Sequence, residues 1–251
     1  MCRKVIPGLK SQAHMFDHML SAFGLTKRTE YDDEAYVQKF AEAKDAAIRE
    51  AIGPMHEMVL HAIIPYAVGG ALDLYPFHYA RGGTVYATQE VMDPNPANGP
   101  LRNKLGRYEL VACLRKAFSY SEEDSGSTTH EAETDSARGP AREGDRLVSR
   151  VLNPIARYSA MAVLQPGETA EIPETEDAQP GDPDNLYVLF DEFELRGDFN
   201  VLGERCGLLL CMPIHKRECD FARQNSGKEL IARLKTAGVY PYSDLTRRPV
   251  V

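Results

Sequence analysis

The clearest pattern in this chain is an apolar stripe at helical spacing that follows three acidic residues, 32–34. The apolar positions that fall on one helix face are Tyr36, Val37, Phe40, Ala41, Ala47, Ile48, Ala51 and Ile52. Acidic residues favour a helix N-terminus because they interact with the positive end of the helix dipole. Gly53-Pro54 then interrupts the pattern, so the sequence predicts a helix that ends at residue 52.

Two more helices are predicted in the second half of the chain. Residues 146–164 carry an apolar stripe, but Pro154 lies inside it. Proline removes a backbone donor and clashes with the preceding turn, so either the helix kinks there or Asn153 caps a second helix. Near the C-terminus, Ser226 to Glu229 has the form of a capping box, and Gly238 is a suitable helix end.

Between and after these helices the sequence has the alternation and turn signals of β-strands. The segments with strand character are 57–65, 71–77, 84–91, 107–114, 186–194 and 207–214. Residues 84–91 alternate between two faces, whereas 207–214 is apolar throughout and is expected at the centre of a sheet, buried on both faces. This run of strands predicts an α/β (α+β) fold whose central mixed, largely antiparallel sheet is flanked by helices.

We expect a single domain over residues 1–251, with an N-terminal arm and helix (1–53) and a core (54–251). Two acidic insertions interrupt this core. Residues 118–145 contain eight acidic residues and two arginines, and residues 165–185 contain seven acidic residues and no basic one. Their low hydrophobicity favours mobile loops.

The distribution of charged and apolar residues argues against nucleic acids and membranes as partners. Of the formal net charge of −8, the two insertions carry −6 and −7, so the rest of the chain carries about +5. A nucleic-acid binder would show a clustered basic stripe, and a membrane helix would need roughly 20 consecutive apolar residues. The sequence shows neither pattern, so we expect no nucleic acid and no membrane among the partners. The N-terminus has no signal-peptide pattern, which predicts a cytoplasmic location.

One part of the sequence has the mixture of side chains expected in a polar cleft. Four of the candidate residues lie within one short stretch, and two more come from neighbouring predicted strands. The candidate cleft residues are Asp73, Tyr75, His78, Arg81, Glu90 and Arg107. The alternative is a polar sheet face beside a solvated loop, which needs no site at all.

Other combinations that carry chemistry have unsuitable spacing. The sequence contains neither GxSxG nor HExxH, and its glycine doublets do not form a nucleotide-binding motif. His14 and His18 are spaced for one face of a short helix expected around residues 13–23, but no third metal ligand is visible. The cysteines and histidine at 206, 211, 215 and 219 are spaced too widely for a structural zinc site. We expect no metal and no cofactor, and reduced cysteines buried as small apolar side chains.

The ordered features form a series that resembles the suppressor of fused (SUFU-like) family, in its bacterial type. The segments that carry the resemblance are GGTVYATQEVMDPNP, LGRYELVACL, RYSAMAVL and the C-terminal stretch from LLLCMPIHKRECDF to DLTRRPVV. In the C-terminal stretch the family pattern corresponds to Pro213-Ile214, Glu218, the helix 226–238 and Asp244-Leu245-x-Arg247. The similarity spans about residues 57–251, with both acidic insertions as additions.

This resemblance implies a binding scaffold without an active site. Eukaryotic members of the family bind and sequester a transcription factor, and bacterial relatives are encoded beside polymorphic toxins and act as their immunity proteins. The implied function is non-enzymatic binding of another protein, and a basic toxin domain is the partner that the acidic insertions would suit. Two alternatives stay open: an uncharacterised hydrolase or metal-dependent enzyme that uses the cluster at 73–81, and a structural subunit that oligomerises through a sheet edge. The sequence predicts no particular oligomeric state.

Overall fold

The structure is a computed structural model that describes residues 31, 33–118, 140–175 and 177–251. The short helix expected near the N-terminus, with its two histidines, and most of the first acidic insertion lie outside the described residues. The described elements, in chain order, are α2 (Glu34–Ile52), the 3-10 helix η2 (Tyr66–Val68), β1 (Tyr75–His78), β2 (Thr84–Ala87), β3 (Arg107–Leu114), α3 (Pro140–Ser159), β4 (Thr169–Ile172), β5 (Leu186–Glu192), β6 (Asn200–Val201), β7 (Glu204–Ile214), α4 (Lys216–Gln224) and α5 (Gly227–Thr236).

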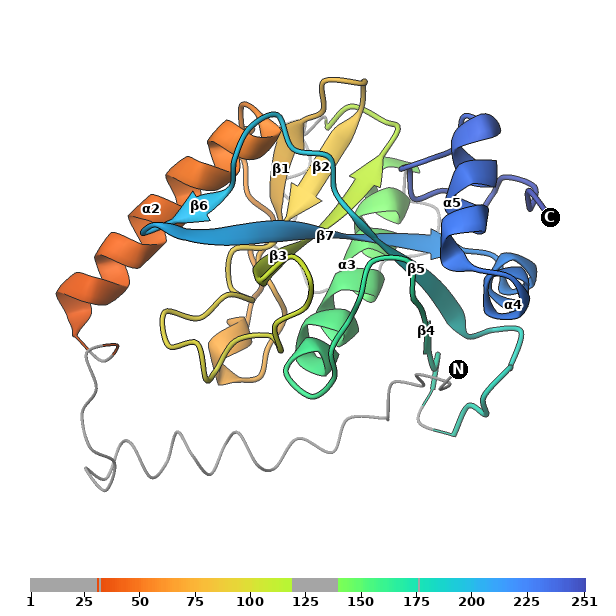
Figure 1. Cartoon of the computed structure of the whole chain (residues 1–251), viewed down its shortest axis with the longest axis horizontal. Coiled ribbons are helices and arrows are strands. Elements are labelled where there is room, and N and C mark those ends of the chain that lie inside the picture. Colours follow the sequence, from red (N-terminus) through yellow and green to blue (C-terminus); the bar gives the residue numbers. More distant parts are fainter. Residues whose placement is uncertain (1–30, 32, 119–139, 176) are drawn as a thin grey trace, which may run out of the picture.

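The described strands form a mixed sheet in the order β1-β2-β3-β7-β5-β4, and β6 pairs with β7 beside this path (Figure 1). Among these strands only β3 and β7 are parallel, and the other pairs are antiparallel. A parallel pair needs a long crossover, and here the chain passes through α3, β4, β5 and β6 before it returns to β3. The predicted α/β fold class, with its mixed, largely antiparallel sheet, is confirmed.

The central strand β7 owes its place to its continuous apolar sequence, and β3 beside it carries two buried charged residues, Arg107 and Glu109. All eight residues of β3 are buried, as are the nine consecutive residues of β7 from Cys206 to Ile214. A strand whose two faces are both covered does not need the alternation of a half-exposed strand. The central position predicted for residues 207–214 is therefore confirmed, and β3 has the predicted bounds.

Helices cover both faces of the sheet. One face packs against α2, α4 and α5 in a core that includes Ile48, Leu210 and Leu230. The other face packs against α3 in a core that includes Val151 and Leu209. Figure 1 shows α2 at one end of β7 and the α4–α5 pair at the other end. Successive β7 residues thus point to opposite cores, as the pleat of a strand requires.

Helix α3 begins earlier than the sequence predicts and runs through Pro154 as one helix. The alternative of a second helix capped by Asn153 is wrong, because Asn153 lies inside α3. Its side-chain amide donates to the Ser149 carbonyl (2.9 Å), and its Oδ1 accepts from the Leu72 N–H (2.7 Å). Residues 140–145 also belong to α3. The end of the first acidic insertion is therefore helical rather than a loop.

The second acidic insertion differs from the irregular loop predicted for residues 165–185. It contains β4, which forms the sheet edge beside β5, because Ala170 and Ile172 are apolar and join the core. Glu171 is fully buried and accepts hydrogen bonds from the Asn185 amide (2.9 Å) and from Arg223 (3.3 Å). Burial acts to raise the pKa of Glu171, but these hydrogen bonds outweigh it and hold the pKa below its usual value.

Residues 57–65, predicted as a strand, follow the outer edge of β1 without forming one. Isolated bridges at Met55 and Leu60 join this part of the chain to the edge. Beyond them the chain leaves the sheet, and Ile63 and Ile64 are exposed. The strand prediction is wrong because β-branched residues favour a strand only where a neighbouring strand is available to pair with them.

Candidate functional site

Glu109 lies in the middle of β3 and is fully buried. Its Oε1 accepts hydrogen bonds from Lys44 Nζ (3.0 Å) and from the Met92 N–H (3.0 Å). Its Oε2 accepts from the Thr88 hydroxyl (2.6 Å) and from the Val91 N–H (3.2 Å). A carboxylate has about four acceptor positions, so internal donors saturate this one. Glu109 therefore holds the fold together and has no capacity left for a substrate.

Lys44 completes this network from α2. Only 5% of its surface is exposed, and its ammonium also donates to the carbonyls of Gln89 (2.5 Å) and Met92 (2.8 Å). All three of its N–H bonds are thus used. These contacts explain why β2 ends at Ala87, four residues earlier than predicted. The residues that follow bind the Glu109–Lys44 pair and leave the strand.

A second buried carboxylate fixes the C-terminal tail. Glu218 in α4 is fully buried, and Arg247 binds it through both terminal nitrogens (2.6 and 2.7 Å). The N–H groups of Val250 and His215 also donate to it (2.9 Å each). Burial acts to raise the pKa of Glu218, but the hydrogen bonds, led by those from Arg247, hold the pKa below its usual value. Glu218 and Arg247, two of the charged residues of the C-terminal sequence pattern, are thus partners in one structural contact.

The structure brings three of the six expected cleft residues together. The Asp73 N–H donates to Glu90 Oε2 (2.8 Å), and Tyr75 follows two residues later at the start of β1. Burial, then the charges of Asp73 and Glu90, raise the pKa of Tyr75 to about 12. Asp73 is already occupied, since its carboxylate accepts from the Ala62 N–H (2.8 Å) and pairs with His61 Nδ1 (2.7 Å). This group is a polar seam that anchors the segment before β1.

The other three expected cleft residues make different contacts. Arg107 is buried against the Phe40 ring (5.0 Å from its centroid) and pairs with Glu204 (3.3 Å). Arg81 forms an exposed ion pair with Glu194. His78 stacks on another histidine. The six residues divide among separate contacts because they come from different elements: Arg81 lies in the turn between β1 and β2, and Arg107 lies in β3.

The histidine that stacks on His78 is His56, and the ring centroids are 3.7 Å apart. The Phe118 ring lies 4.9 Å from the His56 ring on another side. His56 Nε2 is buried and has no hydrogen-bond partner among the described residues. Burial, then the neighbouring His78, lower the pKa of His56. Both features indicate that the His56 imidazole is stable in its neutral form.

Three aliphatic side chains stand in solvent at the turn that contains η2. Ile63, Ile64 and Val68 are 101%, 58% and 73% exposed. We call these three residues the aliphatic tip. Single exposed apolar residues are ordinary, but a group of them on one turn is typical of an interaction surface.

The turn beneath the aliphatic tip is firmly held. Arg157 of α3 donates to the carbonyls of Gly69 (2.9 Å) and Gly70 (2.7 Å). The Ala71 N–H donates to the Ile64 carbonyl (3.1 Å). A Cβ on Gly70 would lie 1.8 Å from that carbonyl oxygen, so only glycine permits this close approach. The tip is therefore presented on a built turn, which lowers the entropic cost of binding.

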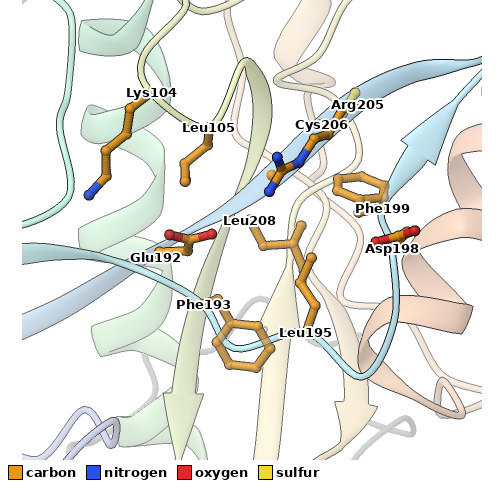
Figure 2. A pocket seen from close by; sticks show the side chains of 11 residues that line it. Lys104, Leu105, Glu192, Phe193, Leu195, Asp198, Phe199, Arg205, Cys206 and Leu208 are labelled. Carbon is orange, nitrogen blue, oxygen red and sulfur yellow. The ribbon is translucent and has the colours of Figure 1, made fainter.

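A shallow hollow of about 190 Å³ lies where the chain between β5 and β6 crosses the sheet (Figure 2). Typical small-molecule sites are about 300–1,000 Å³, so this one is small. Cys206 is among its lining residues, and burial, as the main cause, raises the pKa of that thiol to about 11. A thiol with such a pKa is not a nucleophile at neutral pH. The lining residues come from three separate stretches of sequence, which is why sequence reasoning missed the hollow.

Neither a metal-binding cluster nor a membrane-spanning helix is found in the described part of the chain. It contains no group of three or more His, Cys, Asp or Glu side chains placed to hold a metal ion. No helix within the described ranges is both long and apolar enough to cross a bilayer. The cysteines considered as zinc ligands at 206, 211 and 219 are all buried in the two cores.

Comparison with known proteins points to one family. The sequence matches the family described as "Suppressor of fused protein (SUFU)" over residues 87–248. A solved structure described as "the Sufu-Fu complex crystal structure" aligns with a TM-score of 0.46 and 14% sequence identity, over 86% of this chain and 91% of that chain. No curated protein matches the chain. The matched family range contains both buried carboxylates, Glu109 and Glu218, that hold the loops and the tail.

Proposed function

Because this chain belongs to the suppressor of fused family, we propose that it is a protein-binding domain that captures another protein in a stoichiometric complex. The observation that carries this proposal is the aliphatic tip on its firmly held turn. Leaving three aliphatic side chains in water gains nothing for the fold, whereas burying them against a partner removes their apolar surface from water. The saturated carboxylates Glu109 and Glu218 support the same proposal, since the most enclosed charges maintain structure.

The finer form of this proposal is a cytoplasmic immunity protein that neutralises a polymorphic toxin by binding it. The resemblance to bacterial relatives supports this role. The net charge of −8 also supports it, because an acidic protein attracts a basic partner over long range. In this form the partner is a toxin domain with a basic surface and an apolar site for the aliphatic tip.

The alternative, a hydrolase or metal-dependent enzyme built on the cluster at 73–81, has less support. Asp73 is engaged by a backbone N–H and by His61. Tyr75, with a pKa of about 12, stays protonated at neutral pH and does not act as a base. These contacts favour an anchoring role for the group.

The test is co-expression with the polypeptide encoded beside this gene. We expect light scattering to show a 1:1 complex. The double variant Ile63→Asp/Val68→Asp should weaken binding at least about tenfold in calorimetry, because the loss of an interface hot spot costs ~2 kcal/mol or more. The control is Leu202→Asp, which places the same charge at another exposed apolar residue, in the turn between β6 and β7. Absence of any complex with the wild-type chain would reject the proposal, and equal weakening by the control would reject the tip as the contact.

A further inference from the structure

The segment that leads to the aliphatic tip is attached to the sheet beside a pair of histidines. His56 belongs to this segment and His78 belongs to β1, and their rings are stacked. We propose that this pair is an acid-sensitive latch that holds residues 54–62 on the edge of β1 at neutral pH. Protonation opens the latch, and the aliphatic tip then loses the position in which it binds its partner. This inference rests on the proposed function, because it assigns regulation to the same binding surface.

The attachment of residues 54–62 to the sheet edge is narrow. Four backbone hydrogen bonds of 2.8–3.0 Å make it: from His56 to Pro76, between Leu60 and Leu74 in both directions, and from His78 to Pro54. The Asp73 carboxylate adds its contacts with Ala62 and His61. A segment with few backbone bonds and exposed flanks opens at a lower free energy than the centre of a sheet. Small changes in these few contacts therefore decide whether residues 54–62 stay on the edge of β1.

The histidine pair lies within this attachment. His56 and His78 contribute two of the four backbone donors, and their rings meet across the seam. His56 Nε2 is buried without a partner among the described residues, and the Phe118 ring centroid lies 4.9 Å from that of His56. A neutral imidazole tolerates these surroundings. An imidazolium would lose hydration and would face a second basic ring, so protonation works against the closed seam.

Charged groups near the pair come from several elements. Glu57 follows His56 in the segment itself, and Arg196 lies between β5 and β6. Asp145 in α3, with Lys116 as its charged neighbour, is linked to the pair indirectly, through the Tyr86 and Phe118 rings. Glu57 is exposed, and the Asp145 carboxylate accepts a hydrogen bond from the Tyr86 hydroxyl. The Arg196 guanidinium packs against Gly53, where a Cβ would lie 2.9 Å from its Nη1. Among the described residues, His78 is the basic neighbour that, after burial, lowers the pKa of His56, and no described carboxylate opposes this effect.

The direction of the pH dependence follows from this lowered pKa. Burial first, and His78 second, hold the pKa of His56 below 6.5 in the closed form. In the open form the imidazole returns towards its ordinary pKa, so the open form binds more protons as the pH falls below about 6.5. The closed latch is therefore fully stable above that pH and loses stability as the pH falls through the window below it.

Hydrogen exchange tests the latch without any partner. We expect the protection factors of the Leu60 and His78 amides to fall at least about fivefold between pH 7.5 and pH 5.5, because each pH unit below an open-form pKa of about 6.5 shifts the equilibrium up to about tenfold towards the protonated open form. Protection factors are corrected for the intrinsic pH dependence of exchange. The Leu210 amide in the central strand β7 serves as the internal reference and should keep its protection. A wild-type chain whose Leu60 and His78 amides respond no more than Leu210 would overturn the proposal.

Variants separate this pair from other titrating groups at the seam. His56→Phe keeps a ring in the stack and removes the charge, so the pH response should disappear. His78→Phe, at the exposed end of β1, removes the second basic ring but leaves His56 buried, so the pH response should become smaller; this variant serves if the first one folds poorly. His61→Gln is the matched control, since His61 lies on the same segment but pairs with Asp73. If the response persists undiminished in both phenylalanine variants, or disappears in His61→Gln, the proposal is wrong.

Binding at two pH values then connects the latch to the partner. With the co-expressed polypeptide as the probe, the affinity should fall at least about fivefold from pH 7.5 to pH 5.5 for the wild type and stay level for His56→Phe. A complex that is equally tight at both pH values for the wild type overturns this inference and leaves the proposed function standing. Absence of a complex at both pH values, with a latch that still responds in exchange, overturns the proposed function instead.

Discussion

The Lys44→Met variant is expected to lose about 3–5 kcal/mol of its free energy of unfolding. Methionine keeps the length and apolar stem of the lysine but cannot donate a hydrogen bond. Glu109 would then keep a buried negative charge without its cation, and the carbonyls of Gln89 and Met92 would lose a donor. Breaking one half of a buried ion pair costs more than removing an exposed charge, because the remaining ion cannot recover its hydration. Urea unfolding followed by circular dichroism measures the change.

The control for this prediction is Lys39→Met. Lys39 lies in the same helix but is exposed, so its replacement should change the free energy of unfolding by less than about 0.5 kcal/mol. The double variant Lys44→Met/Glu109→Gln should recover part of the loss, because the unpaired charge is gone. A Lys44→Met variant as stable as Lys39→Met would show that the network around Glu109 does not hold α2 and the residues after β2 to the sheet.

The Arg247→Leu variant should be destabilised by a similar amount, about 3–5 kcal/mol. Arg247 makes both of its contacts with Glu218 at 2.6–2.7 Å, and the carboxylate is fully buried. Without the guanidinium, the C-terminal tail loses its main attachment to α4. Arg248→Leu is the neighbouring control, since Arg248 is exposed and its loss should have little effect. Thermal and urea unfolding of the three chains measure the difference.

The pH dependence of the Arg247→Leu variant provides an independent check. In the wild type the pKa of Glu218 lies below its usual value, so its contribution to stability is present above about pH 4.5 and is lost as the pH falls through the lowered pKa. Removing Arg247 removes the strongest of the hydrogen bonds that counteract the effect of burial on the pKa of Glu218, so this pKa rises. The gap in stability between wild type and variant should therefore narrow as the pH falls from 7 towards 4. A gap that stays constant over this range would mean that Glu218 is not the partner that matters.

The predicted elements that the structure confirms are those with a strong signal in the local sequence. α2 begins after Asp33, whose side chain accepts from the Ala35 N–H, and the acidic run had predicted this start. Ser226 caps α5 by accepting from the Glu229 N–H. The uninterrupted apolar run of β7 predicted a central strand. In each case a few neighbouring residues contain the whole cause, so the sequence alone is sufficient.

The predicted elements that failed depended on distant residues. Residues 57–65 have strand-like side chains, yet they find only isolated bridges at the β1 edge. The acidic stretch at 165–185 was predicted as a loop, yet part of it pairs with β5 as β4. Arg223 forms an ion pair with its buried Glu171, and the Asn185 amide donates a hydrogen bond to the same carboxylate. Pairing partners and counter-charges of this kind are separated in sequence, and no local pattern reveals them.

In the candidate site, too, the sequence predicted some of the contacts and missed those that depend on distant residues. The sequence placed Asp73, Tyr75 and Glu90 in one polar group, and the structure brings them together. It also placed Arg107 there, although that side chain is buried against Phe40 instead. The aliphatic tip was not predicted, since its isoleucines were assigned to the strand predicted at 57–65. Only the turn held by Arg157 reveals that these residues face water.

By itself, the sequence determined the fold class, the start of α2, the cap of α5, the central strand and the family, because each follows from local patterning or from a motif of fixed spacing. The tertiary structure decided the roles of the charged residues. Glu109 and Glu218 have the same chemistry as any surface glutamate, and only burial beside Lys44 and Arg247 makes them structural anchors. Burial, pairing and exposure arise from contacts between distant parts of the chain, so the binding surface and its histidine latch appear only when the chain is folded.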